Sequence, residues 1–142
     1  MHKAKACILM CMDFRLQKST QKWLGENGYL GECDEVIVAG ASRDLVKPLE
    51  DFHRQALLRQ LDLSVKLHDP DEIVIIDHQD CGGYAQDKTI EAGLDKERDK
   101  QEHLKYASEA RIMLEKIFPG KTIKVVYAPL EGEVEVYNMK KY

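Results

Sequence analysis

The sequence contains no apolar stretch long enough to cross a bilayer and no excess of positive charge. Because a membrane-spanning helix needs roughly 20 consecutive apolar residues, we expect no membrane partner. The formal net charge is −4 and the pI is about 5.7. Proteins that bind nucleic acid usually present a basic face, so nucleic acid is not an expected partner either.

The N-terminal region also lacks the pattern of a signal peptide. Residues 1–5 lead directly into a short apolar run that Asp13 and Arg15 interrupt, whereas a signal peptide needs an uninterrupted apolar core. We therefore expect a cytoplasmic protein. In a reducing compartment, cysteines are more often buried, catalytic or metal-bound than paired.

The chain has few cysteines, and they stand at positions 7, 11, 33 and 81. Cys7 and Cys11 could share one face of a strand, but they would lie roughly 13 Å apart along it, which is too far for a disulfide. We expect Cys7 to face the core and Cys33 to lie in a loop. Cys11 and Cys81 are then the cysteines available for chemistry.

Strand-like and helix-like segments alternate along the chain. Compact apolar runs predict strands at 6–10, 36–39, 73–76 and 123–128, with a short edge strand at 134–137. Helical spacing predicts a helix capped by Ser19 or Thr20, a helix from Pro48 to about 67, and a helix from about 97 to 118. The expected buried face of the last helix carries Leu104, Ala107, Arg111, Leu114 and Ile117, and its charged start, 95–102, is expected to be solvated.

Strands that are apolar throughout and separated by helices indicate a parallel sheet covered on both sides. We therefore predict an α/β fold with a mostly parallel four- to five-stranded sheet and helices on both faces. Of the 142 residues, 44% are hydrophobic, which is enough for one core. Residues 1–142 are accordingly expected to form a single domain.

Polar or flexible residues follow three of the predicted strands, at 11–15, 39–42 and 78–83. Ligands of such folds bind at the carboxyl ends of the strands. Zinc prefers thiolate and imidazole ligands, and a catalytic zinc site keeps one position open. Cys11, His78 and Cys81 could supply three ligands, and the glycines that follow Cys81 would let the backbone fold closely behind them. The alternative interpretation is two buried hydrophobic cysteines and a structural histidine.

Asp13 and Arg15 stand two residues apart beside Cys11, where an extended segment would place them on one side as a bidentate pair. This pair could simply stabilise a strand end. It could also hold the carboxylate near the metal, where the carboxylate would accept a hydrogen bond from zinc-bound hydroxide. Asp77 and Asp80 flank the proposed ligand His78, and Asp80 could either support the site or serve as a turn residue.

The motifs at 11–15 (CMDFR) and 78–82 (HQDCG), with Ala39 and Gly40 between them, resemble those of the β-class carbonic anhydrases. The resemblance implies Cys11, His78 and Cys81 as zinc ligands, with zinc as the cofactor and an Asp13–Arg15 dyad as the catalytic pair. It further implies reversible hydration of carbon dioxide to bicarbonate, an α/β fold, and homodimers or higher homo-oligomers.

The sequence departs from the family pattern in several places. The family usually begins with helices that wrap around a partner subunit, whereas this chain begins close to its first strand. Ile37 and Val38 replace a common Arg-Asn pair, Asp77 replaces a frequent glycine, and Phe14 replaces a small residue. We expect these changes to affect the wall of the pocket more than the metal ligands.

Charge predicts how such a site responds to pH. Two thiolates cancel the charge of zinc, so its bound water should be less acidic than at a three-histidine site, where the pKa is about 7. Activity should therefore rise with pH above neutrality. As surface residues we expect His2, His68 and His103, none of which is a strong candidate for carrying the proton away.

Three other functions are compatible with the same residues. Zinc hydroxide could hydrolyse another small linear molecule, such as carbonyl sulfide or carbon disulfide. Asp13 could close the fourth zinc position, which would give a non-catalytic zinc-binding module. Cys81 could act as a nucleophile with His78 as its base, although this would leave Cys11 and Arg15 without a role.

Overall fold

The computed structural model describes residues 2–137. Its strands are β1 (Ala6–Cys11), β2 (Cys33–Val38), β3 (Glu72–His78), β4 (Thr122–Ala128) and β5 (Glu135–Val136). Its helices are α1 (Gln17–Glu26), α2 (Arg43–Val46), α3 (Asp51–His68), α4 (Gly82–Ala85) and α5 (Lys96–Ile117), and a short 3-10 helix, η1 (Phe14–Leu16), precedes α1. None of these helices combines the length and the apolar character that crossing a membrane requires.

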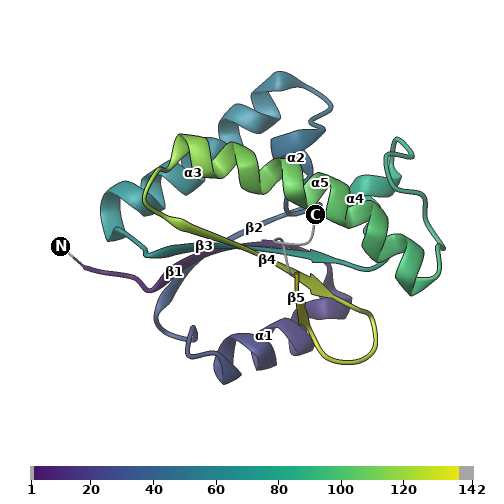
Figure 1. The fold of residues 1–142 in the computed structure, drawn as a ribbon, viewed down its shortest axis with the longest axis horizontal. Coiled ribbons are helices and arrows are strands. Elements are labelled where there is room, and N and C mark those ends of the chain that lie inside the picture. Colours follow the sequence, from purple (N-terminus) through teal and green to yellow (C-terminus); the bar gives the residue numbers. More distant parts are fainter. Residues whose placement is uncertain (1, 138–142) are drawn as a thin grey trace.

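The strands form one five-stranded sheet in the order β2-β1-β3-β4-β5 (Figure 1). Every neighbouring pair is parallel except β4 and β5, which are antiparallel. The α/β fold with a mostly parallel sheet of four to five strands is therefore confirmed. The two central strands, β1 and β3, end at the same edge of the sheet, because Met10 lies opposite Ile76.

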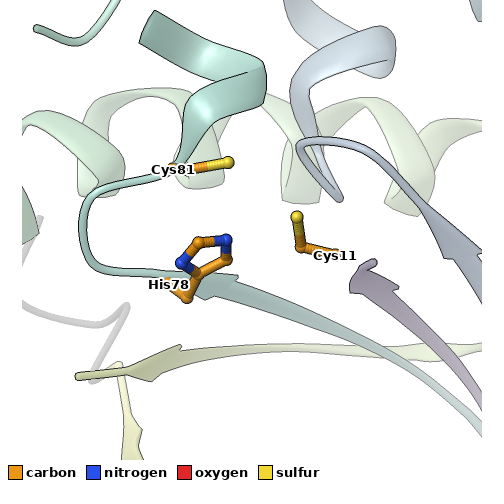
Figure 2. A group of neighbouring side chains, drawn as sticks. All are labelled: Cys11, His78 and Cys81. Carbon is orange, nitrogen blue, oxygen red and sulfur yellow. The ribbon is translucent and has the colours of Figure 1, made fainter. Parts of the chain in front are cut away.

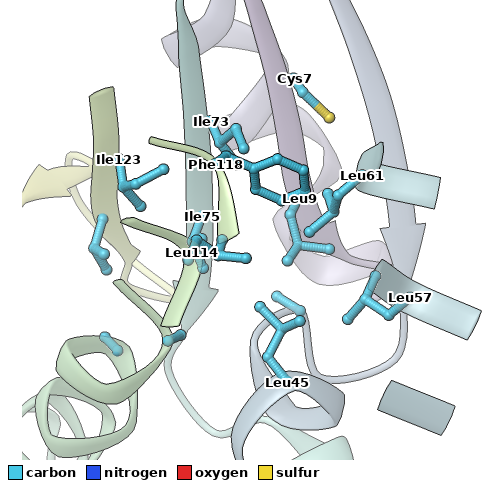
Figure 3. Close-up of a cluster of buried hydrophobic side chains, with 14 of the residues drawn as sticks. Cys7, Leu9, Leu45, Leu57, Leu61, Ile73, Ile75, Leu114, Phe118 and Ile123 are labelled. Carbon is cyan, nitrogen blue, oxygen red and sulfur yellow. The ribbon is translucent and has the colours of Figure 1, made fainter. Parts of the chain in front are cut away.

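Helices cover both faces of the sheet (Figure 1). On one face, Leu61 of α3 and Leu114 of α5 pack with Leu9 and Ile75 in the larger core cluster (Figure 3). On the other face, Trp23 of α1 belongs to a second cluster formed around the opposite sides of the same strands. Burial on both faces explains why the central strands read as continuous apolar runs.

Three details of the sequence interpretation are wrong. The first helix begins at Gln17, and neither Ser19 nor Thr20 caps it, because η1 runs directly into α1 and the Thr20 hydroxyl donates to the Leu16 carbonyl inside the helix. Cys33 begins strand β2 and does not lie in a loop. The helix expected from Pro48 begins at Asp51 and is preceded by the short helix α2.

The buried face of α5 also differs from the expected one. Its fully buried residues follow one helical stripe, which is formed by Asp99, His103, Ala107, Ala110 and Leu114. Ile117 is exposed, and His103, expected at the surface, has an exposed fraction of 0%. The helix is rotated so that Asp99 and His103 meet polar partners beneath it.

The start of α4 packs backbone against backbone on the turn that follows β2. A Cβ atom added at Gly83 would lie 2.8 Å from both the Cα and the amide nitrogen of Gly40. Gly40 itself has a φ of +82°, in the left-handed region that favours glycine. The two glycines therefore permit the close approach of the segment that carries Cys81.

We predict that Gly83→Ala lowers the free energy of unfolding by about 1–3 kcal/mol, because the new methyl group must displace backbone atoms. Gly82→Ala is the matched control, since a Cβ atom at Gly82 meets nothing within 4 Å, and its effect should stay within about 0.5 kcal/mol. Urea unfolding of both variants measures the difference. Equal stabilities would show that the close approach carries no constraint.

Candidate metal centre

Three side chains converge at the carboxyl edge of the sheet (Figure 2). Cys11 is the last residue of β1, His78 is the last residue of β3, and Cys81 immediately precedes α4. One ligand atom from each side chain lies within 4.8 Å of the other two. Among residues 2–137, this is the one group of three or more cysteine, histidine or carboxylate side chains with metal-binding spacing.

The imidazole of His78 is oriented for ligation. Its Nδ1 atom lies 2.7 Å from the carbonyl oxygen of Gln79, which fixes the proton on Nδ1 and leaves the lone pair on Nε2. Within the described part of the chain, Nε2 is buried and has no hydrogen-bond partner. A buried imidazole nitrogen without a partner is costly, and a metal ion would satisfy it.

The two thiols shift each other's pKa in opposite directions. The pKa of Cys11 is lowered to about 4, chiefly because Cys11 interacts with Cys81. His78 and the Gly40 amide, which donates to Cys11 Sγ at 3.3 Å, lower the pKa further, and together these effects outweigh burial. The pKa of Cys81 is raised, because it lies beside the Cys11 thiolate and is buried. Burial opposes protonation of His78, but the Cys11 thiolate outweighs it and raises the imidazole pKa.

This donor set fits zinc. Tetrahedral zinc has Zn–S distances of about 2.3 Å and Zn–N distances of about 2.0–2.1 Å, so its ligand atoms stand roughly 3.5–4 Å apart. The separations within 4.8 Å meet this requirement with small adjustments. Two sulfurs and one nitrogen leave a fourth position for water or substrate.

The Asp13–Arg15 pair forms beside this centre, although not in the extended segment that the sequence interpretation assumed. Asp13 precedes η1 and accepts the backbone N–H of Arg15 at 2.9 Å. The Arg15 guanidinium donates Nη2–H to Asp13 Oδ2 at 2.7 Å and Nε–H to Oδ1 at 3.1 Å. Hydrogen bonds from Arg15 hold the pKa of Asp13 below its usual range. Asp13 Oδ2 lies 3.8 Å from Nε2 of His78.

Arg15 also reaches the turn between the other two candidate ligands. Its Nη1 atom donates to Oδ2 of Asp80 at 3.2 Å, and its Nη2 atom donates to the Asp80 carbonyl oxygen at 2.9 Å. Asp80 has a φ of +58° and accepts the Gly93 amide at 3.0 Å. Asp80 thus combines the two roles that the sequence left open, because it is a turn residue and also supports the site.

A cavity of about 260 Å³ opens beside Cys11 and Asp13. Its apolar wall includes Met12, Phe14 and Ile37, all of which are exposed. The family departures at Phe14 and Ile37 therefore do lie on a pocket wall. The departure at position 77 does not, because the Asp77 carboxylate is only 1% exposed and is not among the cavity's lining residues.

Sequence reasoning missed a buried polar cluster behind the candidate ligands. The Ser42 hydroxyl lies 2.9 Å from both carboxylate oxygens of Asp77 and 2.6 Å from the Tyr84 hydroxyl. On the α5 side, Asp77 and Asp99 flank His103. The sequence carried no clear signal for this cluster, since its members are scattered and Asp99 lies within a charged run.

Comparison with known proteins identifies the family. The model of the family described as "Putative carbonic anhydrase" matches residues 1–138. The chain belongs to this family. A curated relative from Rickettsia bellii, named only as an uncharacterized protein, is 26% identical over 135 residues, which cover 95% of this chain and 82% of the relative. A similar relative from Rickettsia conorii is 27% identical, with coverage of 95% and 73%.

Solved structures of β-carbonic anhydrases have the same fold as this family member. A tetrameric enzyme of Sordaria macrospora superimposes with a TM-score of 0.63 at 13% identity, covering 97% of this chain and 82% of the enzyme. An enzyme of Trichomonas vaginalis gives a TM-score of 0.59 at 18% identity, with coverage of 95% and 82%. At these identities, the similarity establishes the fold.

The geometry of the centre predicts which cysteines bind metal. Cys81→Ser should lose the single equivalent of zinc that the wild type retains through gel filtration, because a neutral hydroxyl replaces a thiolate. Cys33→Ser is the matched control and should keep the full equivalent, since Cys33 packs against the opposite core cluster. Elemental analysis measures the metal. A full equivalent in Cys81→Ser would refute the ligand assignment.

Proposed function

We propose that the protein is a single-domain, cytoplasmic, zinc-dependent carbonic anhydrase that interconverts carbon dioxide and bicarbonate. The observation that carries this proposal is the buried Nε2 of His78, without a partner in the described residues, facing the sulfurs of Cys11 and Cys81. Membership of the carbonic anhydrase family supports it. A reducing compartment would keep the two cysteines available as thiolates.

Each residue of the centre has a distinct part in this chemistry. When bound, zinc would supply a Lewis acid that acidifies water at the fourth position. Asp13, held as a carboxylate by Arg15, is placed to accept a hydrogen bond at that position and so to orient the attacking oxygen. The cavity beside Cys11 and Asp13 offers a site for the uncharged substrate.

Two alternatives fit the contacts less well. If Asp13 were to close the fourth position permanently, it would have to weaken a bidentate pair with Arg15 and a bond from the Arg15 amide. A nucleophilic Cys81 with His78 as its base would give no role to Cys11, although the Cys11 sulfur belongs to the same group of three ligand atoms. Hydrolysis of carbonyl sulfide or carbon disulfide uses the same centre, and substrate assays distinguish it.

Stopped-flow hydration of carbon dioxide tests the proposal directly. Zinc-loaded wild type should turn over, and the rate should rise from neutral to alkaline pH because two thiolate ligands reduce the charge that acidifies the bound water. Asp13→Ala should keep its zinc but lose about 10- to 100-fold in turnover, since it removes a hydrogen-bond acceptor and not a ligand.

Glu35→Ala is the control for Asp13→Ala, because Glu35 lines the same cavity but is not one of the three candidate metal ligands. Its turnover should stay close to that of the wild type. No hydration by a sample that holds one zinc per chain would exclude carbonic anhydrase activity and leave the other small substrates to be assayed. A pH profile that is flat from mildly acidic to alkaline conditions would contradict the two-thiolate ligand set.

We also propose that the chain forms a homodimer or a higher homo-oligomer through the β2 edge. This strand pairs with β1 on one side only. Beside it, Met12 is 67% exposed, Phe14 is 82% exposed and Ile37 is 51% exposed, and these three side chains line one cavity. A contiguous exposed apolar surface of this kind is typical of an interface.

Sedimentation equilibrium tests this assembly. The wild type should sediment as a dimer or larger, and Ile37→Lys should shift it toward monomer, because the ammonium group would be buried in the interface. Ile112→Lys replaces a similarly exposed residue of α5, far along the chain from β2, and should have no effect. A monomeric wild type at micromolar concentration would refute the proposal.

A further inference from the structure

Helix α5 buries two polar side chains that the proposed chemistry does not use. Asp99 and His103 stand four residues apart on the helix and are 1% and 0% exposed. Burying a carboxylate is costly unless hydrogen bonds replace its water. The partners of these two residues therefore indicate what the burial achieves.

Asp99 accepts two hydrogen bonds. Its Oδ1 atom accepts the backbone N–H of Asp80 at 3.1 Å, and its Oδ2 atom accepts the Tyr127 hydroxyl at 2.7 Å. Asp80 is the residue immediately before the candidate ligand Cys81, and its backbone is in the left-handed region, with a φ of +58°. By accepting this N–H, the Asp99 carboxylate fixes the turn between His78, at the end of β3, and Cys81.

His103 makes a corresponding contact with the residue before the other ligand. Its Nδ1 atom lies 3.4 Å from Oδ2 of Asp77, which is the residue immediately before His78. Its Nε2 atom lies 3.6 Å from Oδ2 of Asp99, so the imidazole stands between the two carboxylates. One turn of α5 therefore contacts the residue that precedes each of the two ligands.

We propose that Asp99 is a positioning residue of the metal centre. By accepting the backbone N–H of Asp80, it fixes the position of the neighbouring ligand Cys81. The inference rests on the metal site proposed above. Because Asp80 also receives two hydrogen bonds from Arg15, the same contact fixes the guanidinium that holds Asp13. Asp99 thus touches neither metal nor substrate but determines where Cys81 and Arg15 lie.

Metal affinity of the full-length, metal-free chain tests this role without reference to activity. Zn²⁺ is titrated in competition with a chromophoric chelator, and the visible spectrum of the Co²⁺-loaded protein reports the ligand geometry. Asp99→Ala should bind Zn²⁺ about 10- to 100-fold more weakly, as is usual when a group that orients a ligand is removed, and its Co²⁺ spectrum should change. Asp99→Asn keeps one acceptor oxygen and should recover part of the affinity.

Asp95→Ala is the matched control. Asp95 caps the same helix by accepting the Arg98 amide and is exposed, so its loss weakens α5 without touching the metal turn. Its Zn²⁺ affinity and Co²⁺ spectrum should equal those of the wild type. Equal weakening in Asp95→Ala and Asp99→Ala, or wild-type behaviour of Asp99→Ala, would overturn the proposal.

Two further outcomes are informative. If Asp99→Ala does not fold, Tyr127→Phe is tested in its place, because this change removes only the hydroxyl that donates to Asp99. Tyr127→Phe should bind Zn²⁺ a few-fold more weakly than the wild type. An unchanged Zn²⁺ affinity would overturn the proposal. A wild type that binds no Zn²⁺ would refute the metal site itself. A wild type and an Asp99→Ala variant that bind Zn²⁺ equally tightly would refute only the role of Asp99.

Discussion

The parallel pairing of β1 with β3 is the constraint on which the site depends. Both strands are buried on their two faces, and Met10 lies opposite Ile76, so the strands end together. Cys11 and His78 become neighbours for this reason, although they are distant in sequence. Cys11 follows Met10 by one residue and His78 follows Ile76 by two, so this pairing brings the sulfur and the imidazole to one edge of the sheet.

Charge organises the surroundings of the centre once the strands have placed it. Arg15 is bound by the carboxylates of Asp13 and Asp80, and it thereby joins the segments that follow β1 and β3. Asp80 is held in turn by α5 through Asp99. The guanidinium is thus fixed from two sides, and its hydrogen bonds hold the pKa of the Asp13 carboxyl below its usual range.

Much of this arrangement could be predicted from the sequence, because it follows from local signals. Apolar runs identified the four principal strands, and the spacing of Cys11, His78 and Cys81 identified the candidate ligands that the structure brings together. The burial of His103 could not be predicted, since it depends on how α5 rotates to meet Asp77. The geometry of the turns could not be predicted either. The Asp13–Arg15 pair forms at the start of η1, where the sequence predicted an extended segment.

The ligand positions have a thermodynamic consequence for the whole chain. A metal held by Cys11 together with His78 and Cys81 would cross-link two strands through a long loop, and the unfolded chain would have to close that loop to bind equally well. Binding would therefore be linked to folding: free metal at about 1,000 times its Kd adds about 4.1 kcal/mol to the stability of the folded state. The melting temperature of this protein would then depend on the concentration of free zinc around it as well as on its sequence.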